Sequence, residues 1–196
     1  MDSDQYQGIE MGYSAEYKQL GSKFLGFIHP VRNREEAEEI IKEYRNNYSD
    51  ATHVCTAYVL GVDRDFQMFN DDGEPSNSAG RPILNALLSS ETTFITGLVV
   101  RYYGGKKLGV PGLIEAYGAA INLCLEQAEI KDLVITKEIK VTISPNEQYK
   151  LFNFLNRRND ISHHFNGDEF IIECSQSLTG SLLNELKELP TLAVID

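Results

Sequence analysis

The order of secondary structure in the last part of the chain is the feature that most limits its fold. Patterns typical of strand, helix, strand, strand, helix and strand occur at residues 137–144, 145–155, 160–165, 169–174, 178–189 and 191–195. Asn166 and Gly167, a pair favoured in tight turns, separate the two middle strands. The order β-α-β-β-α-β is the ferredoxin-like split pattern. We therefore predict a ferredoxin-like domain at residues 133–196.

Residues 1–132 show a different mixture of elements, which predicts a second domain. After a polar lead-in or edge segment, the expected strands cover 18–31, 53–60, 66–69 and 94–103, and the expected helices cover 34–48, 81–89 and 113–128. Asn33 is a candidate helix cap, with Glu36 completing a capping box. A second candidate cap, Ser144, precedes Pro145 at the start of the next domain. The whole chain is therefore predicted to be an α+β protein of two domains.

The net charge limits the partners that such a protein can bind. The chain has 196 residues and a formal net charge of −11. Phosphate neutralisation requires Lys and Arg, so this charge argues against a general nucleic-acid binder, and no DNA partner is expected. A local basic patch on an acidic body remains possible, and Arg101, Lys106 and Lys107 form such an island.

Three cysteines and the absence of long apolar runs indicate the compartment. Cys55, Cys124 and Cys174 are widely spaced, and an odd number without a C-x-x-C pattern does not suggest a disulfide framework. The N-terminal residues lack the basic start and apolar run of a signal peptide. No apolar run reaches the roughly 18–20 residues that span a membrane. We expect reduced thiols, no membrane partner and a cytoplasmic location.

The run RYYGGKKLGVPG, residues 101–112, joins the end of a predicted strand to a helix. Its glycines permit positive φ and close approach of the backbone to a ligand, and N–H groups at a helix start attract anions. The residues of this run that we predict to bind are Arg101, Tyr102, Gly104, Gly105, Lys106, Lys107 and Gly109. A tight strand–helix connection with solvated lysines, an anion-contacting surface and a protein-contacting surface are all compatible with the pattern. The run is neither a Walker A loop nor G-x-G-x-x-G.

The run DDGEPSNS, residues 71–78, gathers three carboxylates and two hydroxyls. The candidate binding residues here are Asp71, Asp72, Glu74, Ser76 and Ser78. Carboxylates this close can hold a divalent cation or act as an acid and base pair, but Asp and Gly are also typical of a turn. No EF-hand spacing is present, so neither a metal site nor a cofactor is predicted.

A Cys–His pair is the other candidate for chemistry. His53 and Cys55 alternate onto one strand face, where they can form a dyad or simply face the core. His163 and His164 are adjacent in a strand and face opposite ways, so a shared metal is not expected. No serine lies in a recognisable triad pattern.

Several motifs together resemble the IMPACT family, in its bacterial branch. They are DDGEPSNSAGRPIL, VVRYYGG, KKLGVPGL and AYG, and earlier blocks around residues 22–24 and 51–58 also fit. The chain departs from the family pattern at Asn77 and Ser78, where Gly and Thr are usual. It also departs at Glu115, where Arg is usual, which removes positive charge near the glycine loop.

The resemblance implies a fold for each domain and a role related to translation. It implies that the N-terminal domain is similar to the second domain of a small-subunit ribosomal protein, a four-stranded sheet with packed helices. It implies that the C-terminal domain is similar to a domain of elongation factor G. Eukaryotic relatives modulate translation through an extra N-terminal domain that this sequence does not contain.

We therefore predict a non-catalytic regulator associated with translation. It would bind the ribosome, RNA or a translation-associated protein through the DDGEP and RYYGGKKLG loops. Two alternatives stay open: a peptidase-like hydrolase that uses the acidic cluster or His53 and Cys55, and a protein-docking module without affinity for nucleic acid.

Overall fold

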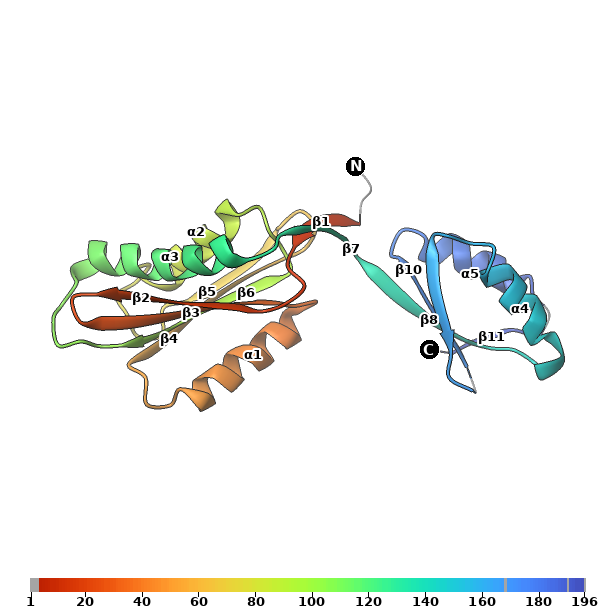
Figure 1. Ribbon diagram of the computed structural model, residues 1–196, viewed down its shortest axis with the longest axis horizontal. Helices are drawn as coiled ribbons and strands as arrows, with labels where there is room; N and C mark the ends of the chain where they lie inside the picture. The colour runs from red at the N-terminus through yellow and green to blue at the C-terminus, as the bar shows by residue number, and fades with distance from the viewer. Residues whose placement is uncertain (1–3, 168, 190, 196) are drawn as a thin grey trace. The chain divides into compact units, whose positions relative to one another are not determined.

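The computed structural model of the protein describes residues 4–167, 169–189 and 191–195 (Figure 1). The chain divides into two compact units. Residues 6–133 form the N-terminal unit, and residues 134–195 with Asp4 and Gln5 form the C-terminal unit. Both mix helices and strands, as predicted. The likeness of either unit to a ribosomal protein or to elongation factor G stays a prediction.

The N-terminal unit is built on a five-stranded sheet with the strand order β2-β3-β6-β4-β5. Every neighbouring pair in this sheet is antiparallel. A separate pair, β1 and β7, forms a two-stranded sheet. The elements in chain order are β1 (Gln5–Gly8), β2 (Tyr13–Gln19), β3 (Ser22–Pro30), α1 (Arg34–Asn47), β4 (His53–Leu60), β5 (Phe66–Asn70), α2 (Gly80–Ser89), β6 (Ile95–Tyr102), α3 (Gly109–Gln127) and β7 (Lys131–Val134).

Helices cover both faces of this sheet. Helices α2 and α3 lie on one face and α1 on the other (Figure 1). On β4, Cys55, Ala57 and Val59 pack toward α2 and α3, while Tyr58 and Leu60 pack toward α1. Burial on two faces favours a continuous apolar strand instead of an alternating one. The central strand β6 fits this pattern, because every one of its residues except Tyr102 is buried.

The first hairpin differs from the sequence prediction. One strand was predicted at 18–31, whereas the chain turns at Leu20 and Gly21 and forms the β2–β3 hairpin. Both turn residues have positive φ, at 47° and 83°. Leu is uncommon in that region, so the turn carried no recognisable sequence signal. The resulting edge strand β2 gives the sheet five strands where the resemblance implied four.

The start of α1 follows the predicted capping arrangement. The Asn33 side chain accepts a hydrogen bond of 2.9 Å from the Glu36 N–H. The Glu36 carboxylate in turn accepts from the Arg32 N–H at 2.8 Å, one residue before the position that a capping box uses. The prediction of a helix starting after Asn33 is confirmed.

Helix α3 contains a glycine that offers a direct test of its packing. A Cβ added at Gly118 would meet no atom within 4 Å. Because Gly weakens a helix interior, Gly118→Ala is expected to raise the free energy of unfolding by about 0.5–1 kcal/mol in urea titrations. In the contrasting variant Gly26→Ala, the new Cβ would lie 2.4 Å from the Ala120 carbonyl oxygen. A loss of stability in both variants would contradict this packing of α3.

The C-terminal unit has the predicted β-α-β-β-α-β order. Its four-stranded sheet has the order β11-β8-β10-β9. The elements are β8 (Thr136–Thr142), the 3₁₀ turn η1 (Pro145–Glu147), α4 (Gln148–Leu155), β9 (Ile161–Phe165), β10 (Phe170–Ser175), α5 (Thr179–Lys187) and β11 (Ala193–Ile195). Leu151, Leu155, Leu182 and Leu186 bury the two helices against the sheet. The Ser144 side chain does not cap α4, because η1 intervenes.

Candidate functional site

The two predicted binding loops lie at the same edge of the sheet because of its topology. Strands β5 and β6 both pair antiparallel with β4 and therefore run in the same direction. Their carboxyl ends share one edge, from which residues 71–79 lead to α2 and residues 103–108 lead to α3. His53, the first residue of β4, lies at this edge too. The fold thus brings together loops that are about thirty residues apart in the sequence.

A pocket of 520 Å³ lies where these segments meet. Four of the predicted site residues line it: Glu74, Arg101, Lys107 and Gly109. The remaining lining residues are Thr52, His53, Pro75, Tyr103, Leu108, Val110 and Leu113. The volume is within the range of about 300–1,000 Å³ that is typical of small-molecule sites.

The base of the pocket contains a buried ion pair. The Arg101 guanidinium donates from Nη1 to Glu74 Oε1, and the two side chains are only 7% and 4% exposed. The Tyr117 hydroxyl donates to the same oxygen at 2.8 Å. The Arg101 Cζ lies 5.4 Å from the centre of the Phe24 ring and 5.5 Å from that of Tyr103. Arg101 therefore contacts an acidic group within the protein, and its charge is not presented at the surface.

The two aspartates of the first loop hold the backbone. Asp71 accepts hydrogen bonds of 2.8–3.0 Å from the N–H groups of Asn77, Ala79 and Gly80, and so fixes the start of α2. Asp72 accepts from the Val54 N–H at 2.7 Å. The carboxylates point to different partners. In the described part of the chain, no group of three or more His, Cys, Asp or Glu residues is arranged to hold a metal ion.

The two serines of this loop differ in exposure. Ser78 is fully buried, and its hydroxyl donates to the Pro75 carbonyl oxygen at 2.6 Å. Ser76 is exposed. Ser78 therefore stabilises the turn, and Ser76 is the hydroxyl that a partner can reach.

The second loop contains two exposed cations. Lys106 and Lys107 are exposed, and within the described residues neither forms an ion pair. Gly105 and Gly109 have positive φ, at 85° and 72°, which allows the loop to turn there. Gly104 has another role: its backbone lies against Gly21 of the β2–β3 turn, where a Cβ would meet the Gly21 carbonyl carbon at 1.9 Å. The close approach predicted for this glycine is thus to the protein's own backbone.

The two adjacent tyrosines face opposite ways. Tyr103 lines the pocket and is 47% exposed, whereas the Tyr102 hydroxyl donates to Asp50 at 3.0 Å. Desolvation and the Asp50 hydrogen bond raise the pKa of Tyr102. Either tyrosine of the sequence could stack on a base or peptide, but only Tyr102 was selected as a predicted binding residue. Strand alternation was the available signal, because Tyr103 lies two residues from Arg101 and shares its face.

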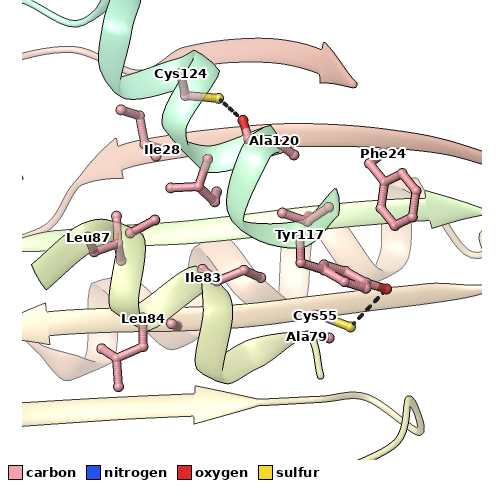
Figure 2. Packing of buried hydrophobic residues seen from close by; sticks show 14 of the residues in the cluster. Phe24, Ile28, Cys55, Ala79, Ile83, Leu84, Leu87, Tyr117, Ala120 and Cys124 are labelled. Atoms are coloured by element: carbon pink, nitrogen blue, oxygen red, sulfur yellow. Dashed lines mark hydrogen bonds between the residues drawn. The ribbon is translucent and has the colours of Figure 1, made fainter. Parts of the chain in front are cut away.

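His53 and Cys55 share a strand face but not an environment. Cys55 is fully buried, and its thiol donates to the Asp71 carbonyl oxygen at 3.1 Å and to the Tyr117 hydroxyl at 3.4 Å (Figure 2). Burial raises the pKa of the Cys55 thiol, which keeps it protonated and a poor nucleophile. His53 lines the pocket, and its Nδ1 lies 2.7 Å from the Asp72 carbonyl oxygen.

This burial predicts the reactivity of the thiols. All three cysteines are free and buried, and burial raises the pKa of Cys124 to about 11. At pH 8 a colorimetric thiol reagent is expected to label the folded protein at least about a hundredfold more slowly than the urea-unfolded chain. Labelling of one thiol of the folded protein at the rate of the unfolded chain, with that thiol identified as Cys55 by mass spectrometry, would contradict the described packing.

The fold and the pocket define a two-unit α+β protein with a pocket at one sheet edge. The Impact N-terminal domain family matches residues 20–125, which is more than half of the chain. The chain is 42% identical over 108 residues to the IMPACT family member YigZ of Escherichia coli (strain K12), covering 54% of this chain and 53% of that protein. It is 35% identical over 137 residues to an IMPACT family member of Thermus thermophilus, covering 70% and 73%. The protein belongs to the IMPACT family.

Similarity to a solved structure extends over both units. A crystal structure described as that of a hypothetical protein is 25% identical, with a TM-score of 0.71, and covers 98% of this chain and 97% of its own. The match to YigZ and to YvyE of Bacillus subtilis (strain 168) spans about half the length of those relatives. Within the described residues, no helix has the length and hydropathy needed to cross a bilayer.

Proposed function

We propose that this protein is a non-catalytic, translation-associated regulator that binds structured RNA, such as that of the ribosome. The contact surface is formed by the DDGEP loop (residues 71–79) and the RYYGGKKLG loop (residues 101–112). The link to translation rests on membership of the IMPACT family. The protein would act in the cytoplasm, where translation takes place.

The convergence of the two loops on one pocket with unpaired lysines is the observation that carries this proposal. Lys106 and Lys107 are the exposed cations of the pocket edge, and Lys107 lines the pocket itself. The acidic loop contributes few free charges there, because Glu74 is neutralised by Arg101. Phosphates can therefore approach this edge despite the formal net charge of −11.

The net negative charge of the protein limits how RNA can bind, and this limit can be tested. Non-specific RNA is repelled by the net charge, so attachment depends on a few local contacts instead of on a broad basic face. The hydrolase alternative finds less support. Cys55 and Ser78 are buried and hydrogen-bonded, and Asp71 and Asp72 are held by backbone N–H groups.

Retention on ribosomes and on bare structured RNA across a salt titration tests the proposal. The variant reverses both loop lysines, Lys106→Glu with Lys107→Glu. The control, Lys42→Glu with Lys137→Glu, makes the same change in net charge at two exposed lysines that do not line the pocket. We expect salt-sensitive retention that falls about tenfold or more in the loop variant and little in the control. Equal retention of the two variants would refute the cationic contact, and salt-insensitive retention would indicate a protein partner.

A further inference from the structure

The pocket has a polar base, apolar walls and a cationic rim, and these three parts fit one kind of ligand. We propose that it binds a single unpaired nucleotide, with the phosphate at the start of α3, the base against Tyr103, and a base amino group on Glu74. This inference rests on the proposed function and specifies its ligand. Sequence-specific recognition of RNA commonly uses unstacked bases of this kind.

The start of α3 provides the phosphate end. No side chain caps this 19-residue helix, and its first turn has no acidic residue. Gly109 and Val110, the first two helical residues, line the pocket. Free N–H groups and the positive end of the helix dipole attract anions. Lys107 lies beside them and adds a full positive charge.

Two buried polar groups at the base have unused hydrogen-bonding capacity. Glu74 Oε1 accepts from Arg101 and Tyr117, but Oε2 has no hydrogen-bond partner among the described residues. The Arg101 Nε is likewise buried without a partner in the described part of the chain. Buried polar groups are nearly always satisfied, so the Arg101 Nε indicates a missing partner. The Glu74 Oε2 is not among the fully buried atoms and is open to a ligand. The Glu74 carboxylate oxygen accepts an N–H, whereas the Arg101 Nε donates one. A base edge that has both a donor and an acceptor therefore fits this end, and a phosphate, which has no donor when fully ionised, does not satisfy Glu74.

The walls suit a flat, largely apolar body. Tyr103 is 47% exposed and 5.5 Å from the Arg101 Cζ, so one part of the ring is supported from within the protein and another is open. Leu108, Val110 and Leu113 contribute aliphatic surface. Bases stack on such exposed aromatic rings in single-stranded RNA complexes. The volume of 520 Å³ accommodates a nucleotide.

Simpler ligands use only part of this pocket. Inorganic phosphate would contact the start of α3 and leave Glu74 unsatisfied and the apolar walls empty. A nucleoside would use Glu74 and Tyr103 but not the helix start or Lys107. A nucleotide uses all three parts. Uridine monophosphate offers Glu74 only an N–H between two carbonyl oxygens, which the carboxylate repels, so adenosine, cytidine or guanosine monophosphate, whose bases have an amino group, is favoured.

A ligand titration of the full chain, followed by amide NMR shifts, tests the inference. The ligands are the four nucleoside 5′-monophosphates, inorganic phosphate and cytidine. We expect saturable shifts at Gly109 and Val110 with at least one amino-bearing nucleotide, and about tenfold weaker binding of uridine monophosphate, phosphate and cytidine. Tyr103→Ala is expected to weaken binding by about fivefold or more, through lost stacking. The matched control, Tyr149→Ala, removes an exposed ring that does not line the pocket and is expected to bind as the unaltered protein does.

A second variant keeps the fold while it blocks the anion end. Val110→Glu places an acidic residue in the first turn of α3, which favours the helix but repels phosphate. We expect loss of nucleotide binding with unchanged thermal stability. Absence of nucleotide binding, or binding equal to that of inorganic phosphate and insensitive to Tyr103→Ala, would overturn the inference. If nucleotide binding fails but retention on ribosomes still depends on Lys106 and Lys107, the proposed function stands and only this inference fails. If retention does not depend on these lysines either, both the inference and the proposed function are refuted.

Discussion

Arg101→Met is expected to lower the free energy of unfolding by about 3–5 kcal/mol. The substitution keeps an unbranched, largely apolar side chain on β6 but removes the cation from Glu74, whose side chain is only 4% exposed. The remaining carboxylate would be buried with the Tyr117 hydroxyl as its main donor. A charge buried without its counterion is strongly destabilising because it has lost its hydration. Urea unfolding followed by circular dichroism measures the effect.

A double substitution separates the ion pair from the packing of Arg101. In Arg101→Met with Glu74→Gln no charge remains buried, so most of the lost stability is expected to return. Lys106→Met removes an exposed lysine from the same loop and is expected to change stability by less than about 0.5 kcal/mol. An Arg101→Met variant within about 1 kcal/mol of the unaltered protein would contradict the buried ion pair.

Gly104→Ala is expected to lower the free energy of unfolding by about 3 kcal/mol. The new Cβ would lie 1.9 Å from the carbonyl carbon of Gly21 and 2.2 Å from the Ser22 nitrogen. Both contacts are with backbone, so either the β2–β3 turn or the RYYGGKKLG loop has to move. The hydrogen bond of 3.1 Å from the Gly104 N–H to the Ser22 hydroxyl would be lost in the process. Thermal and urea unfolding measure the effect.

The next residue in the loop is the matched control. A Cβ at Gly105 would meet nothing within 4 Å, but its φ of 85° is unfavourable for other residues. Gly105→Ala is therefore expected to lower stability by only about 1 kcal/mol, through backbone strain alone. Equal losses of stability in Gly104→Ala and Gly105→Ala would show that the close contact with Gly21 is not the reason for a glycine at position 104.

Local sequence signals were sufficient to predict much of the fold. Asn33 and Glu36 predict the start of α1, because a helix cap depends on groups three residues apart. The ferredoxin-like order follows from alternation, helical spacing and the turn at Asn166 and Gly167. Such features are encoded within a few residues of each other, so one sequence displays them.

Features that depend on contacts between distant residues were not predictable in the same way. The turn at Leu20 is stabilised by a backbone approach to Gly104, more than eighty residues away in the chain. Helix α3 begins at Gly109, earlier than predicted, because Pro111 lies in the first turn, where its missing N–H is not needed.

The candidate site was identified from its residue types, but their roles depend on three-dimensional packing. Arg101 was a candidate phosphate contact by charge, yet its burial with Glu74 makes it part of the pocket base. Tyr117 was predicted as a helix residue and not as a donor to that carboxylate, because a contact between residues 43 positions apart leaves no local sequence signal. Burial and pairing of charges are properties of the folded chain.

The salt dependence of RNA affinity tests the central claim most directly. Affinity of the full chain for a structured RNA with unpaired loops is measured across a salt series, and the logarithm of the association constant is plotted against that of the salt concentration. Each lost phosphate contact reduces the slope by about 0.7 for single strands. The account predicts that reversal of Lys106 and Lys107 reduces the slope by about 1.4, with no change in the Lys42 and Lys137 control. An identical slope in the loop variant and the unaltered protein would contradict RNA binding through these loops.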